Sequence, residues 1–502
     1  MKIKLIAISV LFLSLSACRN FLDVIPETSL TSDSFYKSQA DFEQAVGGIY
    51  APLQGIYNQD WILNEMRSDN TFFIYNVAQR GGKPQEDPAT FTIETNNTYT
   101  AGKWTNCYLI IARANQVLKT IDAASFDEAV KSNLKGQALF LRAFAYFDLV
   151  KNFGGVPLFL EPATGYKDTF KARAEAADVY KQLIIDAAAA AKLLPAKASA
   201  PGRATSGAAY TLLADAYINQ KSWADAEAAL KTVTTLGYKL LPSYADIFKP
   251  TNKGNSELIF DVQYAEGTSQ AIYNALPYLF IPILADPSIL TGVKPASQQN
   301  YGGYNVPTPD LLKVYEDTLK DQRFSASIGF YTGPSPLIGI TSYNRTPYIK
   351  KYLHPHAVYG QTADNGPIYR YAEVLLMLAE STNEQGRQAD AAGYLNQVRA
   401  RAGLPPLTGG SQADMRASIL KERQIELAFE NKRWHDLVRS GLAVQVMTAK
   451  AAKIKANPQA YYYPAGSAPI ATAFNVTDRD LLYPIPVSEI ITNPDLKQNP
   501  GY

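Results

Sequence analysis

Two stretches, LADAYINQKSWADAEAAL (213–230) and LAESTNEQGRQADAAGYL (378–395), repeat each other without a gap. Leucine opens and closes both copies, and the triplet Ala-Asp-Ala stands at the same place in each. Each copy predicts a helix, a short polar turn and a second helix, with small residues where the helices cross. A chance match between two alanine-rich helices is the alternative, because alanine is the best helix former.

Helical spacing extends over most of the chain around these copies. In the segment 129–150, apolar or small residues recur every three or four positions and form one stripe: Val130, Leu134, Ala138, Leu141 and Ala145. We therefore expect a mainly α fold whose helix pairs resemble the tetratricopeptide hairpin, in an interrupted array. Further helices are expected over 34–57, 104–121, 176–193, 207–219, 224–236, 368–384, 390–401 and 414–439.

A long region between residues 239 and 367 departs from this pattern. Proline, glycine and tyrosine accumulate there, as in YGGYNVP (301–307), and one short helix is expected at 309–319. Long irregular segments inside a compact chain are usually functional. We expect loops and short strands lying over the helical scaffold. The mature chain then divides into an N-terminal region, 18–238, and a C-terminal region, 239–502, which includes this loop-rich segment.

The first 17 residues have the features of a lipoprotein signal peptide. Lys2 and Lys4 precede an apolar run that is too short to span a membrane comfortably. The run ends in LSAC (15–18), which resembles a bacterial lipobox. We expect Cys18 to carry acyl chains such as palmitate, since two or more chains give lasting anchorage. The alternative is an ordinary cysteine near a cleavage site for soluble export.

Charge and cysteine usage exclude several classes of protein. Loss of the signal peptide removes two of the 48 basic residues, which leaves 46 against 46 acidic ones. Such a balance offers no basic excess for phosphates, so we expect no nucleic-acid partner. With Cys18 acylated, Cys107 is the only other cysteine, and no intramolecular disulfide can form. Burial must then hold this long chain together.

The sequence contains no convincing set of catalytic residues or metal ligands. Glu422, Glu426 and Glu430 are spaced to share one helix face, but neighbouring arginines favour ion pairs over the raised-pKa acid of a glycosidase. His354 and His356 flank a proline, and His435 is the only other histidine, so a third metal ligand is not indicated. We expect no enzyme activity, no metal and no cofactor.

Aromatic residues give the better functional hypothesis. The chain has 32 tyrosines, whose rings can stack on the C–H faces of sugars while the hydroxyl stays polar. Two segments place aromatic and polar residues close together, one at 61–73 and one in the glycine-flanked loop at 301–305. Most aromatic residues of helical proteins lie in the core, which is the competing interpretation. The candidate ligand-binding residues are Trp61, Asp69, Asn70, Phe72, Tyr301, Tyr304 and Asn305.

Several motifs, in order from the lipobox to the last residue, resemble those of the SusD/RagB family of outer-membrane nutrient-binding lipoproteins. The N-terminal motif FLDVIPET (21–28) follows the lipobox. Characteristic helices match at YRYAEVLLMLAE (369–380), LNQVRARAGLP (395–405), ERQIELAFE (422–430) and RWHDL (433–437), and the chain closes on LYPIP (482–486) and NPGY (499–502).

The resemblance implies a SusD-like fold that binds a glycan or another oligomeric nutrient at the cell surface. It also implies a partner, a TonB-dependent transporter of the SusC type, and a lipid-anchored place in the cell outer membrane. One departure concerns whether the lipid sits in the inner or the outer leaflet of the outer membrane. Arg19 and Asn20 follow Cys18, where surface-exposed lipoproteins often carry acidic residues. A surface glycan-degrading enzyme and a ligand-free structural cap of the transporter are the alternatives. The ligand could be starch-like, another polysaccharide, a glycoprotein glycan or a peptide.

Overall fold

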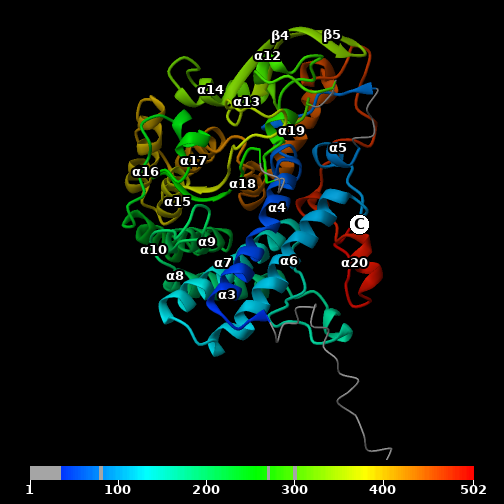
Figure 1. Cartoon of the computed structure of the whole chain (residues 1–502). Coiled ribbons are helices and arrows are strands. Elements are labelled where there is room, and N and C mark those ends of the chain that lie inside the picture. The colour runs from blue at the N-terminus through cyan, green and yellow to red at the C-terminus, as the bar shows by residue number, and fades with distance from the viewer. Residues whose placement is uncertain (1–34, 78–82, 268–271, 298–301) are drawn as a thin grey trace, which may run out of the picture.

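Long helices pair along the chain and pack side by side in the computed structural model, which describes residues 35–77, 83–267, 272–297 and 302–502 (Figure 1). The longer helices are α3 (Gln39–Tyr50), α4 (Pro52–Asp60), α5 (Lys83–Thr90), α6 (Thr98–Thr120), α7 (Glu128–Phe153), α8 (Ala176–Leu193), α9 (Ser206–Asn219), α10 (Trp223–Thr234), α15 (Tyr371–Glu384), α16 (Gln388–Ala402), α17 (Gln412–Glu426), α18 (Arg433–Arg439) and α19 (Ala443–Ala456). The short ones are the π-helix η1 (Trp61–Glu65), α11 (Leu276–Leu279), α12 (Ser288–Thr291), α13 (Pro309–Val314), α14 (Gln322–Ser327) and α20 (Val487–Thr492), besides several 3-10 turns.

Local sequence explains where the two longest helices begin. The Asn97 side chain accepts hydrogen bonds from the first free backbone N–H groups of α6, and Asp127 does the same for α7. Helix α7 ends at Phe153, and the Gly154 that follows adopts a positive φ of 74°. The expected apolar stripe of α7 faces the core, where Ala138, Leu141 and Ala145 are fully buried. In the described residues, no helix is both long and apolar enough to cross a membrane.

The two sequence copies form the predicted helical hairpins, α9–α10 and α15–α16. Their turns match in detail: Lys221 and Gly386, which occupy equivalent positions, both have positive φ (57° and 79°). In each turn the following N–H donates to a carbonyl five residues earlier, a common way to end a helix. Helix α10 also packs against α15, so the copies are neighbours in space although they lie far apart in the sequence.

The last long helix, expected over 414–439, is broken, so that prediction was wrong. Helix α17 ends at Glu426, and α18 begins at Arg433, after six intervening residues. Between them Phe429 and Asn431 have positive φ, 68° and 64°. The Glu65 carboxylate accepts hydrogen bonds from both backbone N–H groups, at 2.9 and 3.0 Å, and so stabilises this unusual turn. Since the helix stops early, Glu430 does not continue the row of carboxylates on α17.

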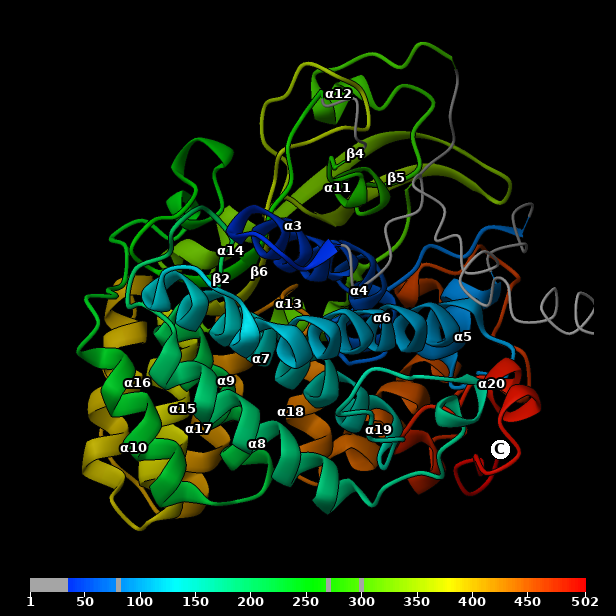
Figure 2. The ribbon, with the colours of Figure 1, turned by 60° about the horizontal axis from the view of Figure 1, so that its bottom comes forward.

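The loop-rich region lies over the N-terminal helices, as predicted (Figures 1 and 2). Three two-stranded antiparallel sheets organise it. Two of them join distant parts of the chain, and the third is a hairpin at one end of the molecule. The pairs are β1 (Thr71–Phe72) with β3 (Val306–Pro307), β2 (Leu258–Val262) with β6 (Gly366–Arg370), and β4 (Ile328–Leu337) with β5 (Ile340–Ile349). The expected helix at 309–319 is shorter, because α13 ends at Val314.

Candidate functional site

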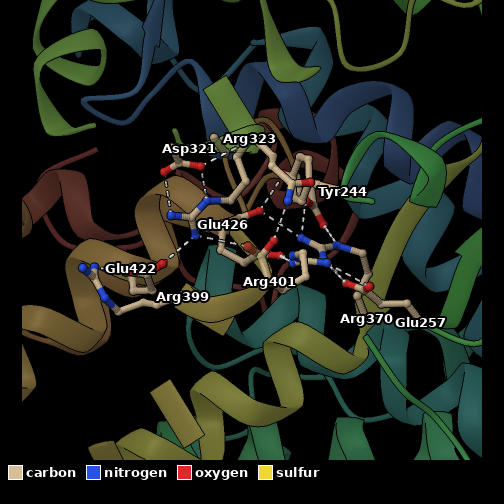
Figure 3. Close-up of polar contacts among 12 residues, drawn as sticks. Tyr244, Glu257, Asp321, Arg323, Arg370, Arg399, Arg401, Glu422 and Glu426 are labelled. Atoms are coloured by element: carbon tan, nitrogen blue, oxygen red, sulfur yellow. Dashed lines mark hydrogen bonds and ion pairs between the residues drawn. The ribbon is translucent and has the colours of Figure 1, made fainter. Parts of the chain in front are cut away.

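Glu422 and Glu426 of α17 belong to a buried network of ion pairs (Figure 3). Glu426 is fully buried and faces three guanidinium groups: Arg370 at 3.0 Å, Arg323 at 3.2 Å, and Arg401. Charges in the network balance, with five carboxylates and five cations. They are Glu257, Asp321, Glu422, Glu426 and Glu430 with Arg323, Lys351, Arg370, Arg399 and Arg401.

The electrostatics of this network do not suit acid catalysis. Burial alone would raise the pKa of Glu426, but Arg401, Arg370 and Arg323 outweigh it and lower the pKa to about 2. A carboxylate held ionised in this way cannot donate a proton at neutral pH. The ion pairs instead join α17 to the start of α15, to the end of α16 and to α14. This confirms the structural interpretation of the α17 carboxylates.

An aromatic cleft of about 310 Å³ opens where the N-terminal helices meet the loop-rich region. Residues from six segments line it: α4, η1, α5, the start of α6, the stretch around α11, and the loop before β3. Tyr99, Tyr273 and Tyr304 are half-buried at the cleft, and Trp61, 3% exposed, forms part of the wall. The lining residues are Asn58, Trp61, Gln85, Tyr99, Tyr273, Ala275, Leu276, Leu279 and Tyr304.

Backbone hydrogen bonds hold the Tyr304 side of this cleft in place. The Tyr304 N–H donates to the Leu279 carbonyl at 3.0 Å, and the Gly303 N–H donates to the Ile281 carbonyl at 2.7 Å. A Cβ atom at Gly302 would lie 2.5 Å from that same Ile281 oxygen, so only glycine permits this close approach. The glycines of the loop therefore allow it to pack tightly against the segment around α11.

The hydroxyls of Tyr304 and Tyr99 stay protonated at neutral pH. Burial, with a smaller contribution from the Glu86 carboxylate, raises the pKa of Tyr304 to about 12. Burial also raises the pKa of Tyr99, partly offset by a hydrogen bond from Gln85. Each phenol can thus both donate and accept a hydrogen bond, beside the amides of Asn58 and Gln85. Aromatic faces and neutral hydrogen-bonding groups together suit a sugar.

The structure brings together two of the candidate ligand-binding residues, Trp61 and Tyr304. Their ring centroids are 5.7 Å apart, and both line the cleft. Asp69 lies elsewhere and pairs with Arg433 at 2.7 Å. Burial opposes ionisation of Asp69, but this guanidinium outweighs it and lowers the pKa. Tyr301, like Cys18, lies outside the described residues.

Asn70, Phe72 and Asn305 lie in the interior. Asn70 donates to the Glu65 carboxylate at 2.8 Å, and the ring of Phe72 stacks on that of Phe73. The Asn305 amide oxygen accepts from the Thr71 hydroxyl at 2.6 Å, across the β1–β3 pair. These three side chains contact other parts of the protein and therefore have a structural role. We keep the proposal of ligand contact for Trp61 and Tyr304.

The residues missed by sequence reasoning are Tyr99, Tyr273, Asn58 and Gln85. Tyrosine abundance pointed to the right residue type, but no local signal separates Tyr273 from the many tyrosines in the core. Tyr99 stands two positions after the Asn97 helix cap, and a residue in the first turn of a helix is often accessible. That signal alone could have singled it out.

A larger hollow of about 660 Å³ lies elsewhere, beside α6 and α20. Its walls are mainly apolar, from Trp104, Leu109, Phe159, Phe170 and Leu496. Polar residues such as Asn115, Gln116 and Asn493 also line it, but a smaller share of its surface is polar than in the aromatic cleft. Polar groups usually give a ligand site its specificity. The smaller aromatic cleft is therefore the better candidate for a glycan.

The histidines make protein contacts of their own. His354 Nδ1 pairs with Asp364, and His356 Nε2 lies 2.6 Å from the Tyr278 hydroxyl. His435 is half-buried, and desolvation holds its pKa well below the ordinary value, so its ring is neutral. Over the described ranges, three or more His, Cys, Asp or Glu side chains are nowhere grouped as metal ligands.

Comparisons with known proteins agree with the resemblance. A family model described as the SusD family matches residues 334–502, and one described as starch-binding associating with outer membrane matches residues 20–218. The chain is 29% identical to SusD-like protein P2 of Formosa agariphila, over 98% of each chain.

Solved structures share the fold over nearly the whole chain. A SusD superfamily protein from Bacteroides vulgatus, 25% identical, matches with a TM-score of 0.76 and covers 93% of this chain and 100% of its own. A laminarin-binding SusD-like protein, also 25% identical, matches with a TM-score of 0.74 over the same shares. The mainly helical fold with few short strands is thereby confirmed.

Proposed function

Because this chain belongs to the SusD/RagB family, we propose that it is a lipoprotein of the outer membrane that binds a glycan in its aromatic cleft and delivers it to a transporter. The family consists of non-catalytic binding proteins, so hydrolysis is not part of this function. The observation that carries the proposal is the cleft, which is lined by three half-buried tyrosines and Trp61. The matched laminarin-binding protein supports a sugar as ligand.

A polysaccharide array probed with the full-length protein in mild detergent tests this function. We expect at least one polysaccharide to be retained, because the cleft offers aromatic platforms and neutral hydrogen-bonding groups. The bound polymer, recovered and run on a sizing column, should keep its chain length. Shortened products would contradict a purely binding role. Retention of no glycan would favour the ligand-free structural cap.

Lipid anchorage at Cys18 is the second element of the proposal. Replacement of Cys18 by alanine removes the acylated sulfur, so the variant should appear in the soluble fraction after cell breakage. Its circular dichroism spectrum and melting temperature should match those of the parent, because the proposed lipid anchors the chain and does not hold its helices together. A variant that remains in the membrane pellet after a salt wash would show that something other than the lipid holds it there.

The partner is the third element. A binding protein without catalytic groups serves uptake only if a transporter moves its ligand, and the family points to a TonB-dependent barrel of the SusC type. A stable complex should bury well over ~2,000 Å² in total, with aromatic residues near its centre. Mild detergent extraction and pull-down on the tagged lipoprotein should recover one large barrel near stoichiometry. Recovery of the lipoprotein alone, where known barrel complexes survive, would favour a free-standing binder.

A further inference from the structure

The polar groups lining the cleft are of one chemical kind. Three tyrosines and two amides, from Asn58 and Gln85, line it, and a phenol or an amide can both donate and accept a hydrogen bond. The Asn58 oxygen already accepts one from the Tyr264 hydroxyl, at 3.0 Å. A sugar hydroxyl also does both, so the two sets of groups are complementary. A carboxylate or a sulfate only accepts, and proteins usually hold it with arginine or lysine.

Among the described residues, the charged side chain that acts on Tyr304 of the cleft is acidic. Glu86 follows Gln85 on α5, and its carboxylate contributes to the raised pKa of Tyr304. Two cations that are close in sequence face the interior instead. Lys103 is fully buried between Asp60 and Asp148, and Arg67 is enclosed by three aromatic rings and donates to two backbone carbonyls.

Apolar side chains complete the walls of the cleft. Leu276 and Leu279 of α11 lie on one side, and the ring of Trp61 packs against Phe280 at 5.4 Å. These surfaces match the C–H face of a pyranose ring. A charged substituent pressed against them would lose its hydration without a counter-ion, which is costly.

We propose that the cleft selects uncharged sugar units and discriminates against uronate and sulfate groups. This inference rests on the proposed function and adds the ligand class to it. Gln85 is then a specificity-determining position, because it stands at the cleft next to the acidic Glu86. A neutral amide there hydrogen-bonds a hydroxyl, whereas a lysine would provide the positive charge that an anionic sugar needs.

Matched polymers of one backbone test this proposal on the full-length protein in mild detergent. The best neutral polysaccharide from an array is compared with its carboxymethyl derivative and with its hydroxyethyl derivative, an uncharged control of similar bulk. We expect the carboxymethyl polymer to bind at least about tenfold more weakly than the hydroxyethyl polymer, a ratio equivalent to ~1.4 kcal/mol. Gln85→Lys should reduce that ratio severalfold, and Ala228→Lys on the exposed face of α10 should leave it unchanged.

Each outcome bears on a different claim. Equal or tighter binding of the carboxymethyl polymer would overturn the preference for neutral sugars while the binding function stands. The same holds if the array retains only anionic polysaccharides. If Gln85→Lys and Ala228→Lys reduce the binding ratio equally, a general effect of added positive charge explains the reduction. That result would contradict the role of Gln85. Absence of any glycan binding would remove the proposed function itself.

Discussion

Replacement of Glu426 by alanine should lower the free energy of unfolding by about 3–5 kcal/mol, the range found when one partner of a buried ion pair is removed. The side chain is fully buried and faces Arg323, Arg370 and Arg401. Its loss leaves these three guanidinium groups without a shared counter-charge. Urea denaturation followed by circular dichroism measures the change. Because a chain of this size can unfold through intermediates, the shift in midpoint is the primary observable.

The effect should depend on pH in a defined direction. The pKa of Glu426 is lowered from 4.5 to about 2 in the folded protein. A lowered folded pKa contributes stability above the unfolded value, and that contribution is lost as pH falls. The difference between parent and variant should therefore be constant above pH 4.5 and shrink between pH 4.5 and about 2. A difference that grows on acidification would contradict the assignment of Glu426 as a permanently ionised residue.

An exposed pair provides the matched control. Glu161 pairs with Lys119 at 3.0 Å, but 69% and 62% of the two side chains are exposed. Solvent and salt screen such a pair, so Glu161→Ala should leave the midpoint nearly unchanged. If Glu161→Ala and Glu426→Ala lower the urea midpoint by similar amounts, burial of the ion-pair network does not determine its contribution to stability.

Joint replacement of Tyr99 and Tyr304 by alanine should weaken glycan binding on the order of a hundredfold or more. An exposed aromatic platform contributes ~1–3 kcal/mol when a ring stacks on it, and two platforms are lost here. Both tyrosines are half-buried at the cleft, so stability should fall much less than binding. Titration with the polysaccharide retained on the array measures the affinity. Tyr166→Ala, which removes an exposed tyrosine of a distant loop, should leave it unchanged.

Trp61 is a less suitable site than Tyr99 and Tyr304 for testing ligand binding by mutation, although the sequence analysis selects it. Its ring is 97% buried and packs against Phe280 and Tyr304, so alanine there would create a cavity. We expect Trp61→Ala to lower stability and binding together, as a core substitution does. Trp434→Ala, which removes a fully buried ring beside Arg67, should lower stability alone.

The helical fold could be predicted because its signals are local. Apolar residues at helical spacing identified α7, and the two repeated stretches identified two hairpins whose turns share one backbone conformation. The end of α17 could not be predicted in this way. Phe429 and Asn431 adopt positive φ because Glu65, 364 and 366 positions earlier, accepts hydrogen bonds from their N–H groups.

The cleft was only partly predictable for the same reason. Its walls come from residues 58–61, 85, 99, 273–279 and 304, which meet only after folding. Composition indicated tyrosine, and loop context indicated Tyr304, but neither shows which rings remain accessible. Phe72 belongs to an equally attractive segment, yet the β1–β3 pair places it in the core.

Calorimetric titration of the retained polysaccharide into the full-length protein distinguishes binding in the cleft from catalysis, since heat reports both binding and bond cleavage. We expect heats that saturate at a defined stoichiometry and a baseline that returns after each injection. The Tyr99→Ala/Tyr304→Ala variant should give no saturating heat at the same concentrations. A sustained heat flow that scales with protein concentration would reveal catalysis. Saturating heats unchanged in the variant would place the ligand somewhere other than the cleft.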